Sequence, residues 1–133
     1  METAAKILIV GGVLNLAYGV LTGLVLTNVR RTSSEAPRYL TLAHIGPLMQ
    51  GPTLLGLAIA VALSDLSAPL ETLAASLLVA SSVALAAGDT LSWTGRVGDA
   101  FAERPAGFYF QGTGAVLFAA GLLIVIIGVL RGL

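Results

Sequence analysis

Four long stretches of this sequence contain no charged residue, and they limit the folds that the chain can adopt. They are Ile7–Val29, Tyr39–Ser64, Thr72–Gly88 and Pro105–Leu130. A helix needs about 20 mostly apolar residues to cross the hydrocarbon core of a bilayer. None of the stretches alternates apolar and polar residues with the period of two that a membrane strand requires. The sequence therefore predicts an all-α integral membrane protein, folded as a four-helix antiparallel bundle.

The polar segments between these stretches set the expected helix boundaries. The first connection ends in Pro37-Arg38, and the second ends in Pro69, which suits the first turn of a helix. The third connection is longer, and we expect it to hold a short interfacial helix. The first stretch exceeds the apolar core of a signal peptide, so we predict a retained helix there. One transmembrane domain is expected over residues 1–133, with helices at about 5–29, 38–64, 69–93 and 106–131.

Composition excludes several classes of function. Hydrophobic residues make up 56% of the chain and charged residues only 11%, whereas soluble domains carry about 25% charged residues. The formal net charge is zero and no basic run occurs, which argues against nucleic-acid binding. The absence of cysteine excludes disulfides and iron–sulfur ligands. Five arginines lie in the first and third connections, so the positive-inside rule predicts that these loops are cytoplasmic; they are Arg30, Arg31, Arg38, Arg96 and Arg104.

Small residues recur along the predicted helices at spacings that permit close packing. Gly114, Gly121 and Gly128 repeat every seven residues on the last helix. Similar small residues line the first helix, at Gly12, Gly19 and Gly23. Small residues let helix backbones approach closely, which favours association in lipid. Two interpretations stay open here: tight packing within one chain, or oligomerisation of several copies.

The only histidine, His44, lies within the second uncharged stretch. It is either a structural side chain hydrogen-bonded to a neighbour, or a ligand for a metal or haem. With one histidine, no cysteine and only Met1 and Met49 as thioethers, a bis-histidine haem and a two-histidine metal site are excluded within one chain. A haem bound here would be five-coordinate. Pro47 is expected to bend the helix near His44 and leave room for a flat group.

Polar residues from all four predicted helices fall in the half of the membrane next to the arginine-bearing loops. The sequence therefore predicts a pocket open toward these loops, whereas the other half is featureless, as in residues 122–127. Each polar residue also has a simpler interpretation. Asp89 suits an interfacial position, and Trp93 and Tyr109 suit an aromatic belt. Interhelical hydrogen bonds suit Asn15, Tyr18 and Gln111. The group comprises Asn15, Tyr18, Thr22, His44, Gln50, Asp89, Thr90, Ser92, Trp93, Tyr109, Gln111 and Thr113.

The segment Ala43-His44-Ile45-Gly46-Pro47-Leu48-Met49-Gln50-Gly51 resembles the Ala-His-x-Gly-Pro-x-x-Asn-Gly motif of styrene oxide isomerases. These are small bacterial membrane proteins with four helices, and the length of this chain and the place of the motif agree with theirs. The resemblance covers about nine residues and is otherwise architectural. It implies haem b as cofactor, His44 as the axial ligand of the haem iron, a homotrimer, and a location in the bacterial inner membrane.

The resemblance also implies site residues. Gln50 stands where the family has a pocket asparagine, and Gly51 closes the motif. No tyrosine stands at the end of the third helix, where the family has one, so Asp89 or Tyr18 is expected to supply a polar group. Arg38 and Arg96, in the nearby loops, are expected to meet the haem propionates.

The resemblance implies an isomerase that converts a small hydrophobic epoxide to an aldehyde. Haem would act as a Lewis acid on the epoxide oxygen, and Gln50, Asp89 and Tyr18 would orient the substrate or stabilise charge on the oxygen. Because Gln50 departs from the family motif and the tyrosine is missing, a haem carrier or gas sensor without isomerase activity is one alternative. A structural four-helix membrane protein, in which His44 only hydrogen-bonds a neighbour, is the other.

Overall fold

The computed structural model describes all 133 residues and contains helices but no strands. Four helices are long: α1 (Thr3–Thr32), α2 (Arg38–Ala62), α3 (Ala68–Thr94) and α5 (Ala106–Gly132). A single turn, α4 (Ala100–Glu103), lies between α3 and α5. Each long helix is long and apolar enough to cross a membrane. The all-helical fold and the four candidate spans are therefore confirmed.

The helix ends agree with the predicted ones to within three residues. The largest difference is in α1, which continues through Arg30 and Arg31 to Thr32 instead of ending at residue 29. No proline or glycine stops the helix there, and basic side chains in a last turn interact favourably with the helix dipole. The expected short helix in the third connection is α4. The Asp99 carboxylate accepts hydrogen bonds from the backbone N–H groups of Phe101 and Ala102, which caps its first turn.

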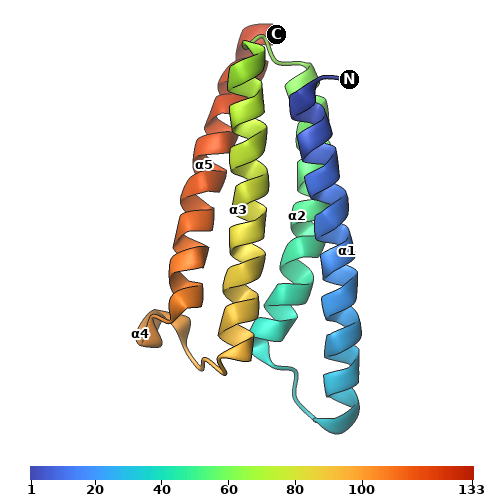
Figure 1. Cartoon of the computed structure of the whole chain (residues 1–133), viewed down its shortest axis with the longest axis vertical. Helices are drawn as coiled ribbons and strands as arrows, with labels where there is room; N and C mark the ends of the chain where they lie inside the picture. The colour runs from blue at the N-terminus through green and yellow to red at the C-terminus, as the bar shows by residue number, and fades with distance from the viewer.

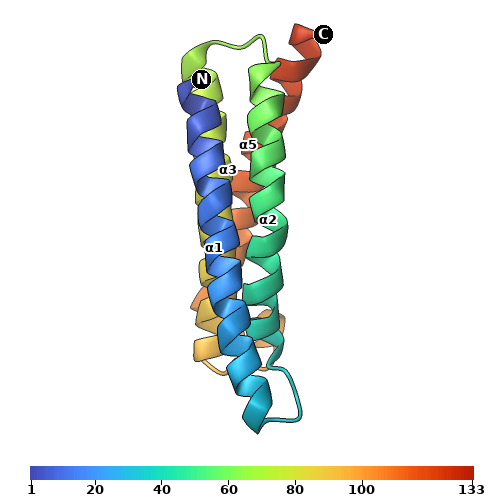
Figure 2. The same ribbon diagram turned by 90° about the vertical axis from the view of Figure 1, so that its right-hand side faces the viewer.

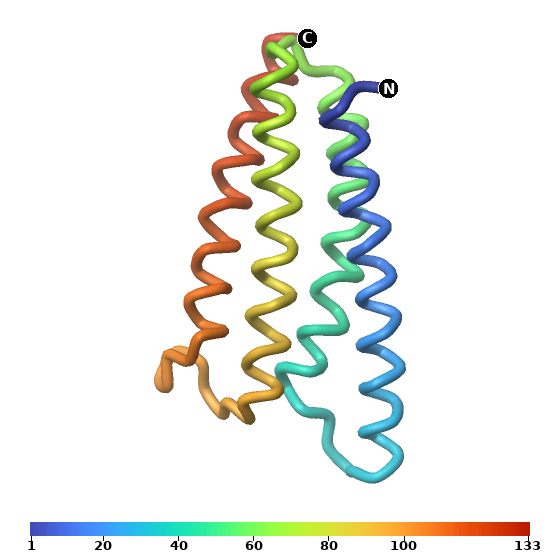
Figure 3. Tube along the Cα trace, in the orientation of Figure 1, coloured from blue at the N-terminus to red at the C-terminus, as the bar shows by residue number.

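Consecutive long helices run in opposite directions, side by side along the long axis of the molecule (Figures 1 and 2). The most extensive contacts join α1 to α2 and α3 to α5. Both termini and the loop between α2 and α3 lie at one end, called here the terminal end (Figure 3). The other two loops and α4 lie at the opposite end, called the arginine end, where α1 extends beyond the other helices (Figure 3).

Small residues occupy the contacts between helices, and large apolar side chains point outward. A Cβ atom added at Gly121 would lie 2.8 Å from Leu78 Cγ, and one at Gly114 would lie 2.8 Å from Leu85 Cγ. These glycines, like Gly128, are buried against the same chain. The glycine repeat on α5 therefore serves packing within one chain, the first of the two interpretations, and is not available to another copy.

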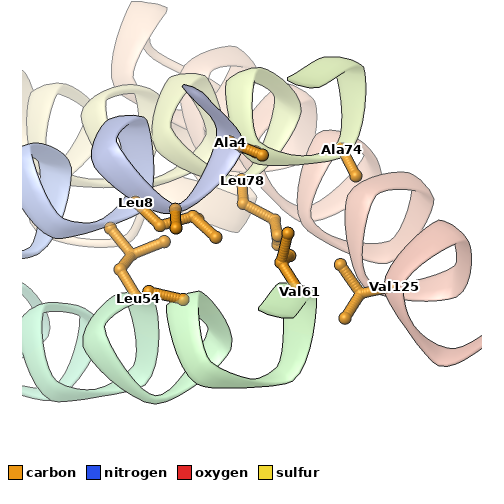
Figure 4. Packing of buried hydrophobic residues seen from close by; sticks show 10 residues of the cluster. Ala4, Leu8, Leu54, Val61, Ala74, Leu78 and Val125 are labelled. Atoms are coloured by element: carbon orange, nitrogen blue, oxygen red, sulfur yellow. The ribbon is translucent and has the colours of Figure 1, made fainter. Parts of the chain in front are cut away.

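The hydrophobic core is concentrated at the terminal end. Its side chains come from all four long helices, among them Leu8, Leu54, Leu78 and Val125 (Figure 4). The residues of this cluster all lie in the half of their helix next to the terminal end, whereas a few buried apolar side chains, such as Leu40 and Ala43, lie near the arginine end. Buried polar side chains occur in both halves, and they include Glu71 in the first turn of α3 and Ser92 near its last turn. The hydrophobic core is therefore denser at the terminal end, but the half predicted to be featureless contains a buried charged residue, Glu71.

Candidate functional site

His44 lies at the contact between α1 and α2, and its imidazole is oriented by the backbone of α1. Nδ1 of His44 lies 2.7 Å from the carbonyl oxygen of Gly19. Because a carbonyl oxygen only accepts hydrogen bonds, Nδ1 carries the proton and donates. In the neutral imidazole, the other ring nitrogen, Nε2, is then unprotonated and has a free lone pair. A metal-ligating histidine usually has this arrangement, in which a backbone carbonyl fixes the tautomer.

Gly23 makes room for the imidazole. A Cβ atom at Gly23 would lie 2.6 Å from Cε1 of His44 and 2.8 Å from Nδ1. One turn earlier, a Cβ at Gly19 would meet Leu48 at 2.7 Å. The hydroxyl of Thr22 donates to the carbonyl oxygen of Ala43 at 3.1 Å, which adds a polar link between the two helices. Gly19 and Gly23 are one turn apart on α1, and they leave space for Leu48 and His44, which are one turn apart on α2.

The side chains near His44 are compatible with a haem iron that has one protein ligand. No group of three or more His, Cys, Asp or Glu side chains is placed to hold a metal ion. Met49 is five residues along α2 and is 67% exposed, so it lies on a different face from His44. His44 is half-buried. Ile45, which follows it on α2, and Val20, which follows Gly19 on α1, are exposed. The residues present fit a haem held by one histidine at the outer surface of α1 and α2.

Gln50 and Gly51 do not lie beside His44. Gln50 is six residues further along α2, on the face turned toward the interior, and its Oε1 atom is buried without a hydrogen-bond partner. Gly51 packs against α1, where a Cβ would lie 2.6 Å from Leu16 Cγ and 3.0 Å from the Gly12 carbonyl oxygen. The space left by Gly51 is therefore filled by α1 and is not open to a cofactor.

Tyr18 lines a cavity of about 540 Å³ between α1 and α3, called here the α1–α3 cavity. Its hydroxyl group hydrogen-bonds the hydroxyl of Thr90 at 2.5 Å. On the same side, Nδ2 of Asn15 donates to Ser82 Oγ at 2.9 Å. The remaining lining is apolar, from residues such as Val83. The interhelical hydrogen bonds considered for Asn15 and Tyr18 are therefore present, and they face α3 instead of His44.

Asp89 lines a second cavity of about 420 Å³ at the arginine end, called here the α4 cavity. Arg38 lies at its rim, with its guanidinium 5.6 Å from the centre of the Tyr39 ring. A Cβ at Gly46 would lie 3.8 Å from Oδ2 of Asp89, so the carboxylate approaches α2. From α5, Gln111 lines the same cavity and donates through Nε2 to the carbonyl oxygen of Leu85. The remaining loop arginine of the predicted site, Arg96, is exposed and has a positive φ of 53°.

The structure thus divides the predicted pocket into three places. His44 is at the α1–α2 contact, Tyr18 is in the α1–α3 cavity, and Asp89 and Arg38 are in the α4 cavity. Sequence reasoning missed the residues that close the α4 cavity, Tyr39 and Phe101. The one available signal was Asp99 with Glu103 four residues later, which resembles a capping box and indicates an ordered turn.

In comparisons with known proteins, no family model, no curated protein and no solved structure matches this chain. The functional assignment therefore depends on the side-chain geometry described above. His44 carries most weight in it, because its second nitrogen is left free by a hydrogen bond that fixes the ring.

Proposed function

We propose that this chain is a haem-b-dependent membrane isomerase that converts small aryl epoxides to aldehydes. The observation that supports this proposal is the hydrogen bond from His44 Nδ1 to the Gly19 carbonyl. It holds the ring in the tautomer that leaves Nε2 free for iron. The short sequence motif around His44, which resembles that of styrene oxide isomerases, supplies the reaction. Under this proposal the helices form an antiparallel bundle in the bacterial inner membrane, with the arginine end in the cytoplasm.

Haem b, when bound, would supply a Lewis acid for the epoxide oxygen, and the isomerisation to the aldehyde would consume no oxidant or reductant. The chain's own part begins with His44, which holds the cofactor through Nε2 while the Gly19 carbonyl fixes its orientation. His44 would be the one protein ligand of the haem in this chain, since no group of three or more His, Cys, Asp or Glu side chains is placed to hold a metal ion, and substrate would bind at the haem. The exposed apolar residues Val20 and Ile45 exclude water around it.

A homotrimer completes the proposed site. His44 is half-buried at the surface of α1 and α2, so a large flat cofactor bound there needs a second copy to cover it. A cyclic trimer presents a different face to each neighbour. Tyr18, Gln50 and Asp89, the proposed catalytic residues, lie away from His44 in the same chain. Tyr18 therefore acts on substrate only if a neighbouring copy brings its α1–α3 cavity to the His44 surface.

This distribution of polar residues favours a second candidate, a haem-binding membrane protein without isomerase activity. In both candidates His44 binds the haem iron, and they differ in whether the protein isomerises an epoxide. Purified protein reconstituted with haem should convert styrene oxide to phenylacetaldehyde if the first is correct. Haem binding without turnover would support the second.

The ligand role is tested by absorption spectroscopy. We expect a Soret band in the wild-type protein, its loss in His44→Ala, and its return when imidazole is added to that variant. Met49→Ala is the matched control, since Met49 is the only thioether on α2 and it is exposed. A Soret band that persists unchanged in His44→Ala would contradict both haem assignments. If wild-type protein given excess haem shows no Soret band, the remaining interpretation is that His44 has a structural role and only hydrogen-bonds a neighbour.

A further inference from the structure

The α4 cavity is a separate site that the proposed haem chemistry does not use. It is lined by residues of α2, α3 and α5 at the arginine end and by Ala100 and Phe101 of α4. His44 is not among its lining residues. Binding pockets for small molecules have volumes of about 300–1,000 Å³ and combine apolar walls with a few convergent polar groups. The α4 cavity, at about 420 Å³, has both features.

The only acid that lines the cavity is Asp89, which lies five residues before the end of α3. A helix rises 1.5 Å per residue, so Asp89 lies roughly 8 Å inside the helix end. Placing an ionised acid in a membrane span is costly, and such residues generally mark a ligand or ion pathway. Asp89 shares the cavity with the side chains of Gln111 and Ser92. These groups supply acceptor oxygens, which suit a cation.

Three aromatic rings contribute to the wall, together with small and aliphatic side chains such as Ala115 and Leu42. Phe101 of α4 and Phe108 of α5 line the cavity and stack edge to face, with ring centres 5.5 Å apart. Tyr39 lines it from α2, and its hydroxyl oxygen accepts a hydrogen bond of 2.8 Å from the backbone N–H of Ala100. This bond holds α4 at the cavity. Aromatic faces attract organic cations, most strongly where water is excluded.

The one cation at the cavity, Arg38, lies at the rim. It is exposed at the first residue of α2, whereas Asp89 is half-buried. Solvent and salt screen an exposed charge much more than a buried one. Arg38 therefore opposes a bound cation less than Asp89 attracts it.

We propose that the α4 cavity binds a small organic cation, an amine or quaternary ammonium with an apolar body. Asp89 is its counter-ion, and the rings of Phe101, Phe108 and Tyr39 surround its apolar part. The site does not depend on haem, and its loss leaves the haem assignment unaffected.

Equilibrium dialysis with benzyltrimethylammonium tests this proposal. The protein is held in phosphatidylcholine nanodiscs at low ionic strength, so that the lipid adds no net charge. We expect saturable binding of one cation per chain, weakened at least about tenfold in Asp89→Asn. Asp65→Asn is the matched control, because it removes the same charge from an exposed loop at the terminal end. Phenylacetate, which has the same benzyl group and a negative charge, should not bind.

A second pair of variants tests the cavity itself without changing charge. Gly112 lines the cavity, and a Cβ atom there would have no neighbour within 4 Å. Gly112→Leu should therefore fill the cavity without disturbing the helices and abolish binding. Gly56→Leu, at another glycine with open space around it, should bind like the wild type. Circular dichroism and the elution volume confirm that each variant is folded.

Three results would overturn the proposal. One is the absence of saturable binding to the wild type. Another is equal binding by folded Asp89→Asn or Gly112→Leu. The third is preferential binding of phenylacetate, which would show that Arg38 and not Asp89 determines the charge of the ligand.

Discussion

Replacing Gly23 by alanine should displace the imidazole of His44 with little change in stability. The added Cβ would lie 2.6 Å from Cε1 of His44. The ring must retreat by about 0.8 Å to restore an ordinary carbon contact near 3.4 Å. This movement takes Nδ1 out of line with the Gly19 carbonyl, which now lies 2.7 Å away. Losing an interhelical hydrogen bond in a membrane costs about 0.6 kcal/mol, whereas glycine to alanine in a helix gains up to about 1 kcal/mol. The net change in unfolding free energy should stay within about 1 kcal/mol.

The single histidine makes this change directly visible by nuclear magnetic resonance. Protein labelled with ¹⁵N-histidine gives one pair of imidazole nitrogen signals, and the haem-free wild type should show protonated Nδ1 and unprotonated Nε2. Gly23→Ala should shift both signals toward those of a mixture of tautomers, and it should lower haem occupancy under the haem proposal. Gly56→Ala serves as control, since its Cβ meets no atom within 4 Å. If the Gly23→Ala signals equal those of the wild type, the close contact and its role in fixing the tautomer are refuted.

Three further predictions concern the packing around the cavities. Asn15→Ala removes the buried donor to Ser82 and should lower the unfolding free energy by about 1 kcal/mol, measured by denaturant titration in mixed micelles; no loss would show that the bond contributes nothing. Tyr39→Phe removes the acceptor for the first amide of α4, so hydrogen exchange at that amide should accelerate while that of α3 stays unchanged. Gly107→Ala would force a Cβ against the backbone carbonyl of α3 and should cost about 1–3 kcal/mol. Gly112→Ala on the same helix should cost nothing, and equal stability of the two variants would contradict this account.

The site was less predictable from the sequence than the fold. The motif around His44 identified the residue, but helix counting did not bring the polar residues to one place: Asp89 lies near the arginine end, whereas Tyr18 and Gln50 lie near the middle of their helices. The sequence did not indicate which side of each helix these residues occupy. Successive residues on a helix turn by about 100°, so the direction in which a neighbouring helix lies decides whether two polar groups at the same depth meet.

Gly51 illustrates the same limit. A glycine in a motif is equally compatible with space for a cofactor and with close approach of a second helix. The contact of Gly51 with Leu16 of α1 shows that this glycine permits close approach of the second helix. The glycines of α5 had two interpretations for the same reason, and burial of Gly114 and Gly121 against α3 decides for packing within the chain.

The sequence alone determined the four spans and their ends to within three residues. These properties follow from composition along one dimension, because each span must be apolar over the thickness of the bilayer. Only the tertiary structure decided that His44 donates to Gly19 and that Asp89 lines the α4 cavity. Both depend on how adjacent helices are rotated and how closely they approach. Those quantities are set by the packing of side chains from distant parts of the chain, as at Gly23 and His44.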